Sequence, residues 1–275
     1  MGAMVVSNRA PSRRQSILRV LRRLLVAVIA LLALLAAASG IYLLTLPSVA
    51  SAPQRVRAIL RTHGEPAGSL PAPARLVAAV VSTEDEHFYD NVVVNVLTGA
   101  GRAALAALQT DQDPGGSTID QQLAKSLYGQ QGGVLGSLRE IGLGVKLALG
   151  YSKRQLIRMY LNGVYYGNGY WGVRAASDGY FRTAPADLSW GEAAMLAGLL
   201  KAPSAYDPLA HYGLARSRQS HVLSQLVVNH YLSRAGARAA YAAGLPLARR
   251  AFAQPRKRQA SGVPWRRFSH WPQLI

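Results

Sequence analysis

The sequence predicts a mainly α-helical protein whose first long helix spans a membrane. Strand signals are few, and most of 72–250 shows helical periodicity between turns that contain Gly or Pro. Two motifs in this region, Ser152-x-x-Gln155 and Ser189-x-x-Glu192, have the spacing of capping boxes that begin apolar helices. We therefore assign these four polar side chains a structural role.

The predicted membrane helix covers 24–46, which carries no charge and is longer than the roughly 20 residues that cross a bilayer. Six arginines precede it in the basic segment 1–23, and the first acidic residue is Glu65. The positive-inside rule then puts the N-terminus in the cytoplasm and everything after Pro47 outside. The alternative is a cleaved signal peptide, but its apolar part is only about 7–15 residues long, so we favour a retained anchor.

The charge balance indicates anionic partners. The chain has 31 Lys and Arg against 13 Asp and Glu, a formal net charge of +18. An extracytoplasmic domain favours acidic lipid headgroups or a lipid-linked phosphate over nucleic acid. The absence of cysteine excludes disulfides and thiolate metal sites. We find no His, Asp and Glu cluster with metal-ligand spacing, and we interpret His87 as a surface residue.

Two segments leave alternatives open. The apolar, Gly-interrupted segment 92–113 is either a buried helix or a flap on the membrane surface. The tail 249–275 mixes Arg and Lys with Trp and Phe. That composition suits either the membrane interface or a solvated tail.

The sequence concentrates acidic residues in 82–91, which contains Glu84, Asp85 and two more of the chain's few acids. A helix over 74–90 would put Glu84 on one apolar face with Val77, Val80, Val81 and Phe88. A carboxylate held against apolar side chains becomes a stronger base, which suits general acid–base catalysis. The alternative is that Glu84 ends the helix or pairs with an arginine.

Glu140 is a second isolated carboxylate. The predicted buried face of its helix consists of Val134, Leu138, Ile141 and Val145. Small neighbours, Gly136, Ser137 and Gly144, leave the surroundings of Glu140 open to a bulky ligand. Two such carboxylates suggest sugar chemistry, in which acidic and basic groups flank a glycosidic centre. Between them, Ser117 and Asp120 are predicted to cap a helix that stops at Gly129.

Five motifs in order resemble the peptidoglycan glycosyltransferase family, the transglycosylase module of penicillin-binding proteins. They are EDEHF at 84–88, GGSTIDQQLAK at 115–125, Glu140, the segment 151–181 and the segment 192–208. The similarity covers roughly 70–245. A chain of 275 residues leaves no room for a transpeptidase domain, so it resembles the monofunctional members.

The resemblance implies a lysozyme-like fold for a domain over 47–248, with a small membrane-associated jaw at 92–113. It also implies polymerisation of lipid II, a disaccharide-pentapeptide on undecaprenyl pyrophosphate, into β-1,4-linked glycan. The implied location is the bacterial inner membrane, with a single span and an extracytoplasmic catalytic domain. The implied partners are lipid II, the growing glycan, anionic lipids and other wall-synthesis proteins, without nucleic acid. No cofactor is obligatory, and a divalent cation at the pyrophosphate is left open.

The resemblance also assigns roles to residues. Glu84 matches the base that deprotonates the acceptor 4-hydroxyl, Asp85 its partner, and Glu140 the second glutamate near the donor. Lys125 matches a lysine that holds the donor phosphate. The remaining substrate-binding candidates are Ser117, Thr118, Gln121, Gln122, Phe88 and Arg139.

The sequence departs from the family pattern around these residues. Asn91, Val93 and Asn95 stand where the first motif has His, Gly and Asp, and Asp120 stands for a usual Thr. Gly136 and Ser137 replace an Arg-Lys pair, and Arg158 and Ala148 replace glutamates; replacement charge could come from Arg139, Lys146 and Arg158. Three functions follow: an active glycan polymerase, a weakly catalytic lipid II-binding or scaffold subunit, and a lysozyme-type hydrolase. The 115–125 motif favours the first over the third.

Overall fold

The computed structural model describes residues 13–66, 70–90 and 117–248. Within these ranges the chain forms helices and a single antiparallel bridge between Tyr165 and Trp171, with no extended strand. The prediction of a mainly helical fold is therefore confirmed. The predicted jaw at 92–113 and the tail 249–275 lie outside the described residues, as do Asn91, Val93 and Asn95.

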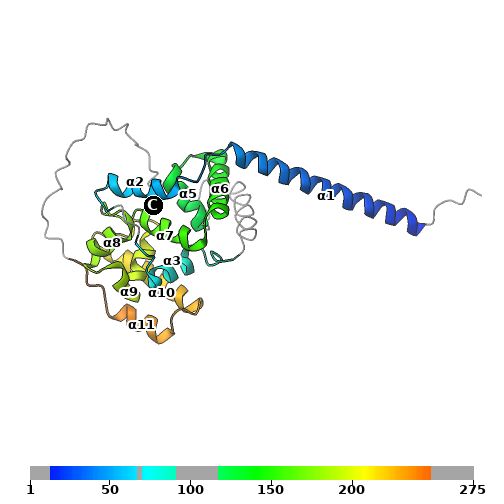
Figure 1. Ribbon diagram of the computed structural model, residues 1–275. Coiled ribbons are helices and arrows are strands. Elements are labelled where there is room, and N and C mark those ends of the chain that lie inside the picture. Colours follow the sequence, from blue (N-terminus) through cyan, green and yellow to red (C-terminus); the bar gives the residue numbers. More distant parts are fainter. Residues whose placement is uncertain (1–12, 67–69, 91–116, 249–275) are drawn as a thin grey trace, which may run out of the picture.

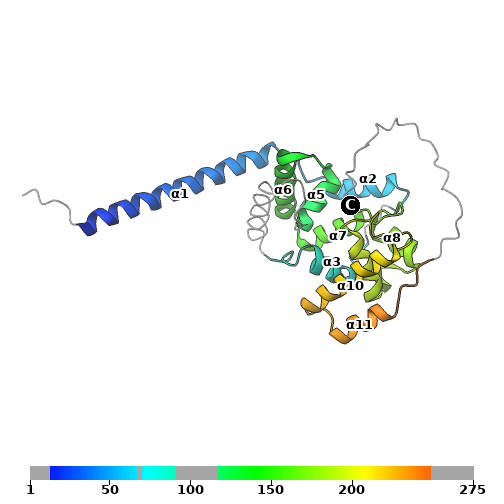
Figure 2. The same cartoon turned by 180° about the vertical axis from the view of Figure 1, so that it is seen from behind.

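Helix α1 (Arg13–Thr45) projects away from the other helices as a separate rod in both views (Figures 1 and 2). Its segment Leu21–Thr45 has a mean hydropathy of 2.8 and none of it is buried by the rest of the protein. A helix of 25 such residues is long enough to cross a bilayer. It contains nearly all of the predicted span 24–46.

The end of α1 is hydrogen-bonded to helix α6 (Gly133–Gly150). The Nζ of Lys146 donates to the carbonyl oxygens of Leu43 and Leu46, at 3.1 and 2.8 Å. These carbonyls lie at the helix end, where they lack partners within the helix. Gly142 lets the two segments approach, because a Cβ there would come within 2.4 Å of the Leu46 side chain. Lys146 thus stabilises the contact between the end of α1 and α6.

Contacts between the helices that follow α1 fall mainly into two groups. In one group, α3 (Ala74–Glu84) packs on α9 (Trp190–Leu199) and α10 (Tyr212–Val228). In the other, α5 (Ile119–Tyr128) packs on α6 and on α7 (Lys153–Gly163). Helix α9 is buried along its length from Gly191 to Leu199. The remaining elements are α2 (Ala52–Thr62), α8 (Gly172–Phe181), the 3-10 turn η1 (Pro185–Asp187) and α11 (Arg234–Ala242).

Two of the three predicted capping pairs are confirmed. Ser152 with Gln155 begins α7, and Ser189 with Glu192 begins α9, each as a complete capping box. For α5 the predicted pair was wrong by one position, since Thr118 is the N-cap and Gln121 is its partner. Gly129 ends that helix with φ of 79°, as predicted, in a region that favours glycine.

The predicted helix over 74–90 was too long. Helix α3 ends at Glu84, and Asp85 leaves the helical conformation with φ −160° and ψ 79°. The chain then turns over 86–89, and Phe88 is fully buried. The cause is tertiary: an Asp85 carboxylate oxygen accepts a hydrogen bond from the Ile119 backbone N–H at 3.1 Å.

The predicted buried face of α6 was also wrong. Val134 is 65% exposed and Leu138 45% exposed, whereas Leu143 and Leu147 are buried together with Glu140. Glycines on this other face allow close packing, because a Cβ at Gly144 would lie 3.2 Å from the Gln121 backbone nitrogen. Helix α5 therefore packs against the glycine-bearing face that carries Glu140.

We expect Ser152→Ala to destabilise the protein by about 1 kcal/mol, because it removes the hydroxyl that accepts from the Gln155 N–H at the start of α7. For a domain of this size the midpoint of thermal unfolding should fall by roughly 2–4 °C. Ser220→Ala, on the exposed face of α10, is the matched control and should leave the midpoint within about 1 °C. Equal midpoints for the two variants would show that the capping box adds nothing to stability.

Candidate active site

Glu84 is the last residue of α3, and its carboxylate receives a hydrogen bond on each oxygen. Oε1 lies 3.2 Å from Nη2 of Arg218, and Oε2 lies 3.2 Å from Nε2 of Gln122. The side chains of Glu84 and Arg218 are 11% and 12% exposed. Glu84 thus ends its helix and pairs with an arginine, as the non-catalytic interpretation expected. It is nevertheless not sealed from solvent.

The neighbouring acids Glu84 and Asp85 lie at helix ends of opposite polarity, Glu84 at the C-terminus of α3 and Asp85 at the N-terminus of α5. Glu84 stands at the C-terminus of α3, where the backbone carbonyls make the local potential negative. Asp85 accepts from the N–H of Ile119, the first residue of α5, where the potential is positive. Asp85 is therefore stabilised by the helix end that it touches, whereas Glu84 needs donors from other elements.

Gln122 is oriented by a buried tyrosine. The hydroxyl of Tyr160, on α7, donates a short hydrogen bond to Gln122 Oε1, so the amide Nε2 is directed to Glu84 and to the Ser117 carbonyl. Burial, and then the nearby Glu84, raise the pKa of Tyr160 well above its ordinary value, so this phenol stays protonated as a donor. Tyr160, Gln122 and Glu84 form a hydrogen-bonded chain across three helices.

Three other residues of the 115–125 motif shape the start of α5. Thr118 Oγ1 accepts from the Gln121 N–H at 3.3 Å, and Gln121 Oε1 accepts from the Thr118 N–H at 3.1 Å. Thr118 is buried and Ser117 is half-buried. Thr118 and Gln121, which the resemblance assigned to substrate binding, hold the helix terminus in this structure.

Glu140 pairs with Lys125. The Lys125 Nζ lies 3.4 Å from Glu140 Oε2, and the two side chains are 29% and 11% exposed. Lys125 follows Gln122 by three residues, so both side chains lie on the same side of α5. One face of α5 therefore contacts both candidate carboxylates, Glu84 through Gln122 and Glu140 through Lys125.

A second ion pair lies beneath the start of α5. The Nζ of Lys153 is 2.9 Å from Asp120 Oδ2 and 4.4 Å from the centre of the Phe88 ring. Burial raises the pKa of Asp120, and Lys153 opposes that shift. Phe88, assigned to substrate binding by the resemblance, is fully buried under this pair. Asp120, which departs from the family pattern, has its partner on α7.

Two of the cations considered as replacement charge cap helices. Nη1 of Arg139 donates to the carbonyls of Tyr128 and Gly129 at the end of α5, at 3.4 and 3.5 Å. Lys146 donates to the end of α1, as described above. The hydrogen bonds of both cations therefore go to backbone carbonyls at helix ends.

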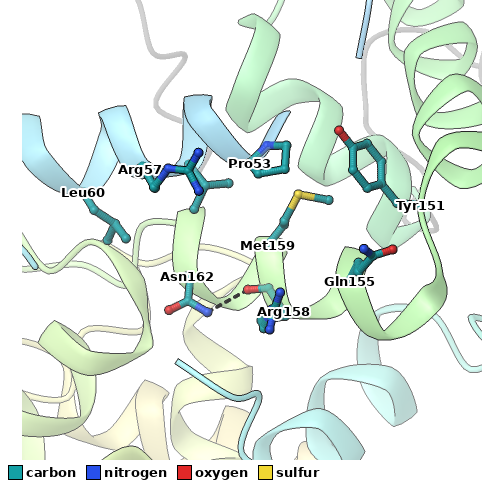
Figure 3. Close-up of a pocket in the computed structure, with 9 residues that line it drawn as sticks. Pro53, Arg57, Leu60, Tyr151, Gln155, Arg158, Met159 and Asn162 are labelled. Carbon is teal, nitrogen blue, oxygen red and sulfur yellow. Dashed lines mark hydrogen bonds between the residues drawn. The ribbon is translucent and has the colours of Figure 1, made fainter. Parts of the chain in front are cut away.

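The third such cation, Arg158, lies at a small cleft between α2 and α7 (Figure 3). The cleft encloses about 100 Å³ and is lined by Pro53, Val56, Arg57, Leu60, Tyr151, Gln155, Arg158, Met159 and Asn162. By helical periodicity, the lining residues of α7 occupy a different face from Tyr160 and Lys153. The cleft is thus separate from the Glu84 site.

No group of three or more His, Asp or Glu side chains in the described ranges could hold a metal ion. His87 lies between two acids: its Nδ1 is 2.8 Å from Asp90 Oδ2, and its Nε2 is 3.6 Å from Glu86 Oε1. All three side chains are about half exposed. The acidic cluster of 82–91 therefore divides into a surface group around His87 and the pair Glu84 and Asp85.

Sequence reasoning missed Arg218, Tyr160 and Lys153. Arg218 is 134 residues from Glu84, and Tyr160 is 38 residues from Gln122. Both partnerships are tertiary, so no local pattern indicates them. One weak indication of Lys153 is present in the sequence. Asp120 stands where a Thr is usual, and an acid that becomes buried needs a cationic partner elsewhere in the chain.

The arrangement suits proton abstraction next to an anionic group. A carboxylate can accept about four hydrogen bonds, and the contacts with Arg218 and Gln122 occupy two of these positions on Glu84. The remaining lone pairs can accept a proton from a substrate hydroxyl. Lys125, partly exposed beside Glu140, supplies positive charge one helical turn away.

Sequence comparisons relate this chain to a known protein family. The sequence model of the Transglycosylase family matches residues 48–227. Penicillin-binding protein 2a of Streptococcus pneumoniae is 41% identical over 157 residues, covering 57% of this chain and 21% of the relative. A protein of Cupriavidus necator described as a candidate transglycosylase is 35% identical over 163 residues, covering 59% of this chain and 70% of that protein.

Among solved structures, Penicillin-Binding Protein 1A from Haemophilus influenzae has a TM-score of 0.39 and 21% identity, over 66% of this chain and 18% of that one. That likeness is too low to add to the assignment. The chain spans about a fifth of the length of the first curated relatives that it matches. The matched region 48–227 contains α2 through nearly all of α10, and with them Glu84, Lys125, Glu140 and Arg218. On these grounds the chain belongs to the transglycosylase family.

Proposed function

We propose that this protein is a peptidoglycan glycosyltransferase that polymerises lipid II into β-1,4-linked glycan and releases undecaprenyl pyrophosphate. The observation that carries the proposal is that one face of α5 contacts both Glu84 and Glu140. The Streptococcus relative, a penicillin-binding protein, and the match to the transglycosylase family support the same reaction class.

In the proposed step Glu84 is the general base. The acceptor's 4-hydroxyl oxygen attacks the donor's anomeric carbon, and its proton passes to a Glu84 carboxylate oxygen. The bond between the anomeric carbon and the pyrophosphate oxygen breaks, and its electron pair leaves with the pyrophosphate. Attack opposite the leaving group inverts the anomeric centre and gives the β linkage.

Lys125 is the proposed cation for the leaving group. A pyrophosphate departs without a strong acid when positive charge stabilises its oxygens. Lys125 is 29% exposed, and Glu140 holds its ammonium at 3.4 Å. Glu140 thereby orients Lys125 towards the donor, and a divalent cation carried on the pyrophosphate would act beside it.

We also propose that α1 anchors the protein in the bacterial inner membrane, with the N-terminus in the cytoplasm. The support is the apolar segment Leu21–Thr45, together with the arginines ahead of it. Exposed apolar side chains on α6, the helix to which α1 is fastened, would meet lipid; they are Val134, Leu135, Leu138 and Leu149. A membrane-bound site suits a lipid-linked substrate, anionic lipids and other wall-synthesis proteins.

A second candidate is a weakly catalytic subunit that binds lipid II or acts as a scaffold. The specific observation is charge: Gly136 and Ser137 stand where the resemblance expects two cations, while Arg139 and Lys146 donate to helix ends. Losing charged hydrogen bonds to a pyrophosphate costs about 1.5–3 kcal/mol each. Product analysis separates this candidate from the polymerase.

Glu84→Gln should reduce polymerisation of labelled lipid II by at least about 100-fold, because it removes the base while nearly keeping the volume. Glu86→Gln is the matched control, since Glu86 is two residues away with a side chain 57% exposed. The measurement is product length and rate with full-length protein in detergent. Full turnover by Glu84→Gln would remove Glu84 from the base role.

The same assay of the native protein distinguishes the functions. Glycan polymer supports the polymerase, and binding without turnover supports the scaffold. Shortened strands from added glycan would instead indicate a hydrolase of the lysozyme type.

Lys125→Gln should lower kcat/KM for lipid II by about 10- to 100-fold, the effect of one charged hydrogen bond to the leaving group. The thermal midpoint should also fall, because Glu140, with a side chain 11% exposed, loses its cation. A lower midpoint with full activity of the folded protein would make Lys125 only a structural partner of Glu140.

Ser137→Lys should raise turnover and tighten lipid II binding by restoring one cation near Glu140. Ser137 is exposed and precedes Glu140 by three residues on α6. Gly136 cannot be used, because a Cβ there would lie 1.9 Å from the Gln131 carbonyl oxygen. Ser137→Gln controls for side-chain length without charge. Equal rates for Lys and Gln at this position would mean that the pyrophosphate is held elsewhere.

A further inference from the structure

We propose that the cleft between α2 and α7 binds a phosphate group, which Arg57 holds from one side and Arg158 from the other. Arg57 lies on α2 and Arg158 on α7, and both side chains line the cleft (Figure 3). Tyr160, which leads to Glu84 through Gln122, lies on another face of α7. The inference therefore goes beyond the proposed reaction and does not depend on it.

The cleft carries positive charge without an acidic partner. In the part of the chain that the structure describes, neither the Arg57 nor the Arg158 guanidinium forms an ion pair or a hydrogen bond, and none of the described lining residues is acidic. Arg158 stands where the resemblance expects a glutamate, so a position that could neutralise Arg57 adds a second cation instead. Like charges at one cleft repel each other, and a bound anion removes that repulsion.

Two guanidinium groups on opposite sides of the cleft favour phosphate over carboxylate. An arginine can form two parallel hydrogen bonds with either anion. A carboxylate presents its two oxygens in one plane, whereas a tetrahedral phosphate presents oxygens to both arginines at once. Gln155 can add a donor, because its Oε1 accepts from Ser152 within the capping box and its NH2 group remains.

The size and the lining of the cleft suit a small anion. Its volume is about 100 Å³, below the roughly 300–1,000 Å³ of pockets for drug-sized ligands. The apolar lining includes Val56, Leu60 and Met159, which are buried at 5%, 4% and 7% exposed. Apolar side chains keep water from one side of an anion, which strengthens its charged hydrogen bonds. Arg57 and Arg158 are exposed, so a phosphate can reach them from solvent.

Hydrogen bonds at both ends fix the frame of the cleft. The Tyr151 hydroxyl donates to the carbonyl oxygens of Val49 and Ala50, just before α2, at 2.8 and 3.1 Å. On α7 the Asn162 amide donates to the Arg158 carbonyl oxygen at 2.8 Å, the dashed line in Figure 3. A site with a fixed frame loses less conformational entropy when it binds a ligand.

Two sources of phosphate can reach this cleft, a phospholipid headgroup and a soluble phosphate. Val49, which Tyr151 contacts, follows Thr45, the last residue of the apolar segment, by four positions. Four extended residues span at most about 14 Å, so this end of the cleft lies near the proposed membrane surface. Both sources present the same phosphate oxygens to Arg57 and Arg158.

The test is the binding of inorganic phosphate to full-length protein in a non-ionic detergent, measured by isothermal titration calorimetry at constant ionic strength. Arg57→Gln should weaken binding by about 10- to 100-fold, the effect of one charged hydrogen bond. Arg158→Glu, which gives Arg57 a counter-ion, should abolish binding. Arg174→Glu is the matched control for net charge: Arg174 is exposed on α8, outside the cleft, and its reversal should change the affinity by less than about twofold.

Thermal unfolding separates a loss of binding from a loss of the fold. In phosphate-free buffer the midpoint of Arg158→Glu should be no lower than that of the native chain, because an ion pair replaces two like charges. Phosphate at about ten times its dissociation constant should raise the native midpoint by about 3–5 °C and leave that of Arg158→Glu within about 1 °C. Arg57→Gln repeats the comparison without a reversed charge.

Bilayer composition identifies the source of the phosphate. The full chain is placed in bilayers of phosphatidylcholine and in bilayers of equal parts phosphatidylcholine and phosphatidylglycerol. If the anionic headgroup occupies the cleft, the second bilayer should raise the midpoint of the native chain and of Arg174→Glu, but not that of Arg158→Glu. If the three proteins respond alike while inorganic phosphate still requires Arg158, the ligand of the cleft is a soluble phosphate.

Three results would overturn the inference. Two are an absence of phosphate binding by the native chain and equal affinities of the native chain, Arg57→Gln and Arg158→Glu. The third is acetate binding as tightly as phosphate, which would indicate a carboxylate ligand, such as an acidic side chain of a partner protein. None of these measurements uses lipid II, so their failure would leave the proposed polymerase to its own assay.

Discussion

The site depends on one interaction: the Glu84 carboxylate at the end of α3 is held by side chains from two other helices. Glu84 terminates α3, where the helix carbonyls disfavour negative charge. Compensation comes from Arg218 on α10 and Gln122 on α5, each 3.2 Å from one oxygen. Because three helices meet at this carboxylate, their relative placement fixes the position of Glu84.

Helix α5 organises the remaining polar groups. Its residues reach three other helices: Gln122 contacts α3, Lys125 contacts α6, and Asp120 contacts α7. Its N-terminus is capped by Thr118 with Gln121, and its C-terminal carbonyls accept hydrogen bonds from Arg139. The described part of the polar motif, 117–125, therefore serves mainly as a set of contacts between helices, and two of these contacts reach the carboxylates of Glu84 and Glu140.

Helix α6 connects the candidate membrane span to the site. Lys146 donates hydrogen bonds to the end of α1, and Gly142 allows α1 to approach closely. Glu140, on the same helix, pairs with Lys125. A continuous helix between these points sets the distance from the end of α1 to the second carboxylate. Such a connection is consistent with the proposed lipid-linked substrate.

The sequence by itself determined the local features of this protein: the capping boxes at Ser152 and Ser189, the stop at Gly129 and the apolar first helix. Each of these depends on residues within a few positions of one another. Only the tertiary structure decided where α3 ends and which face of α6 is buried. The first depends on a hydrogen bond that the Ile119 N–H donates to the Asp85 carboxylate, 34 residues away, and the second on glycines that allow α5 to pack closely. The same holds for Arg218, because a charge pair between residues 134 positions apart leaves no periodic trace in the sequence.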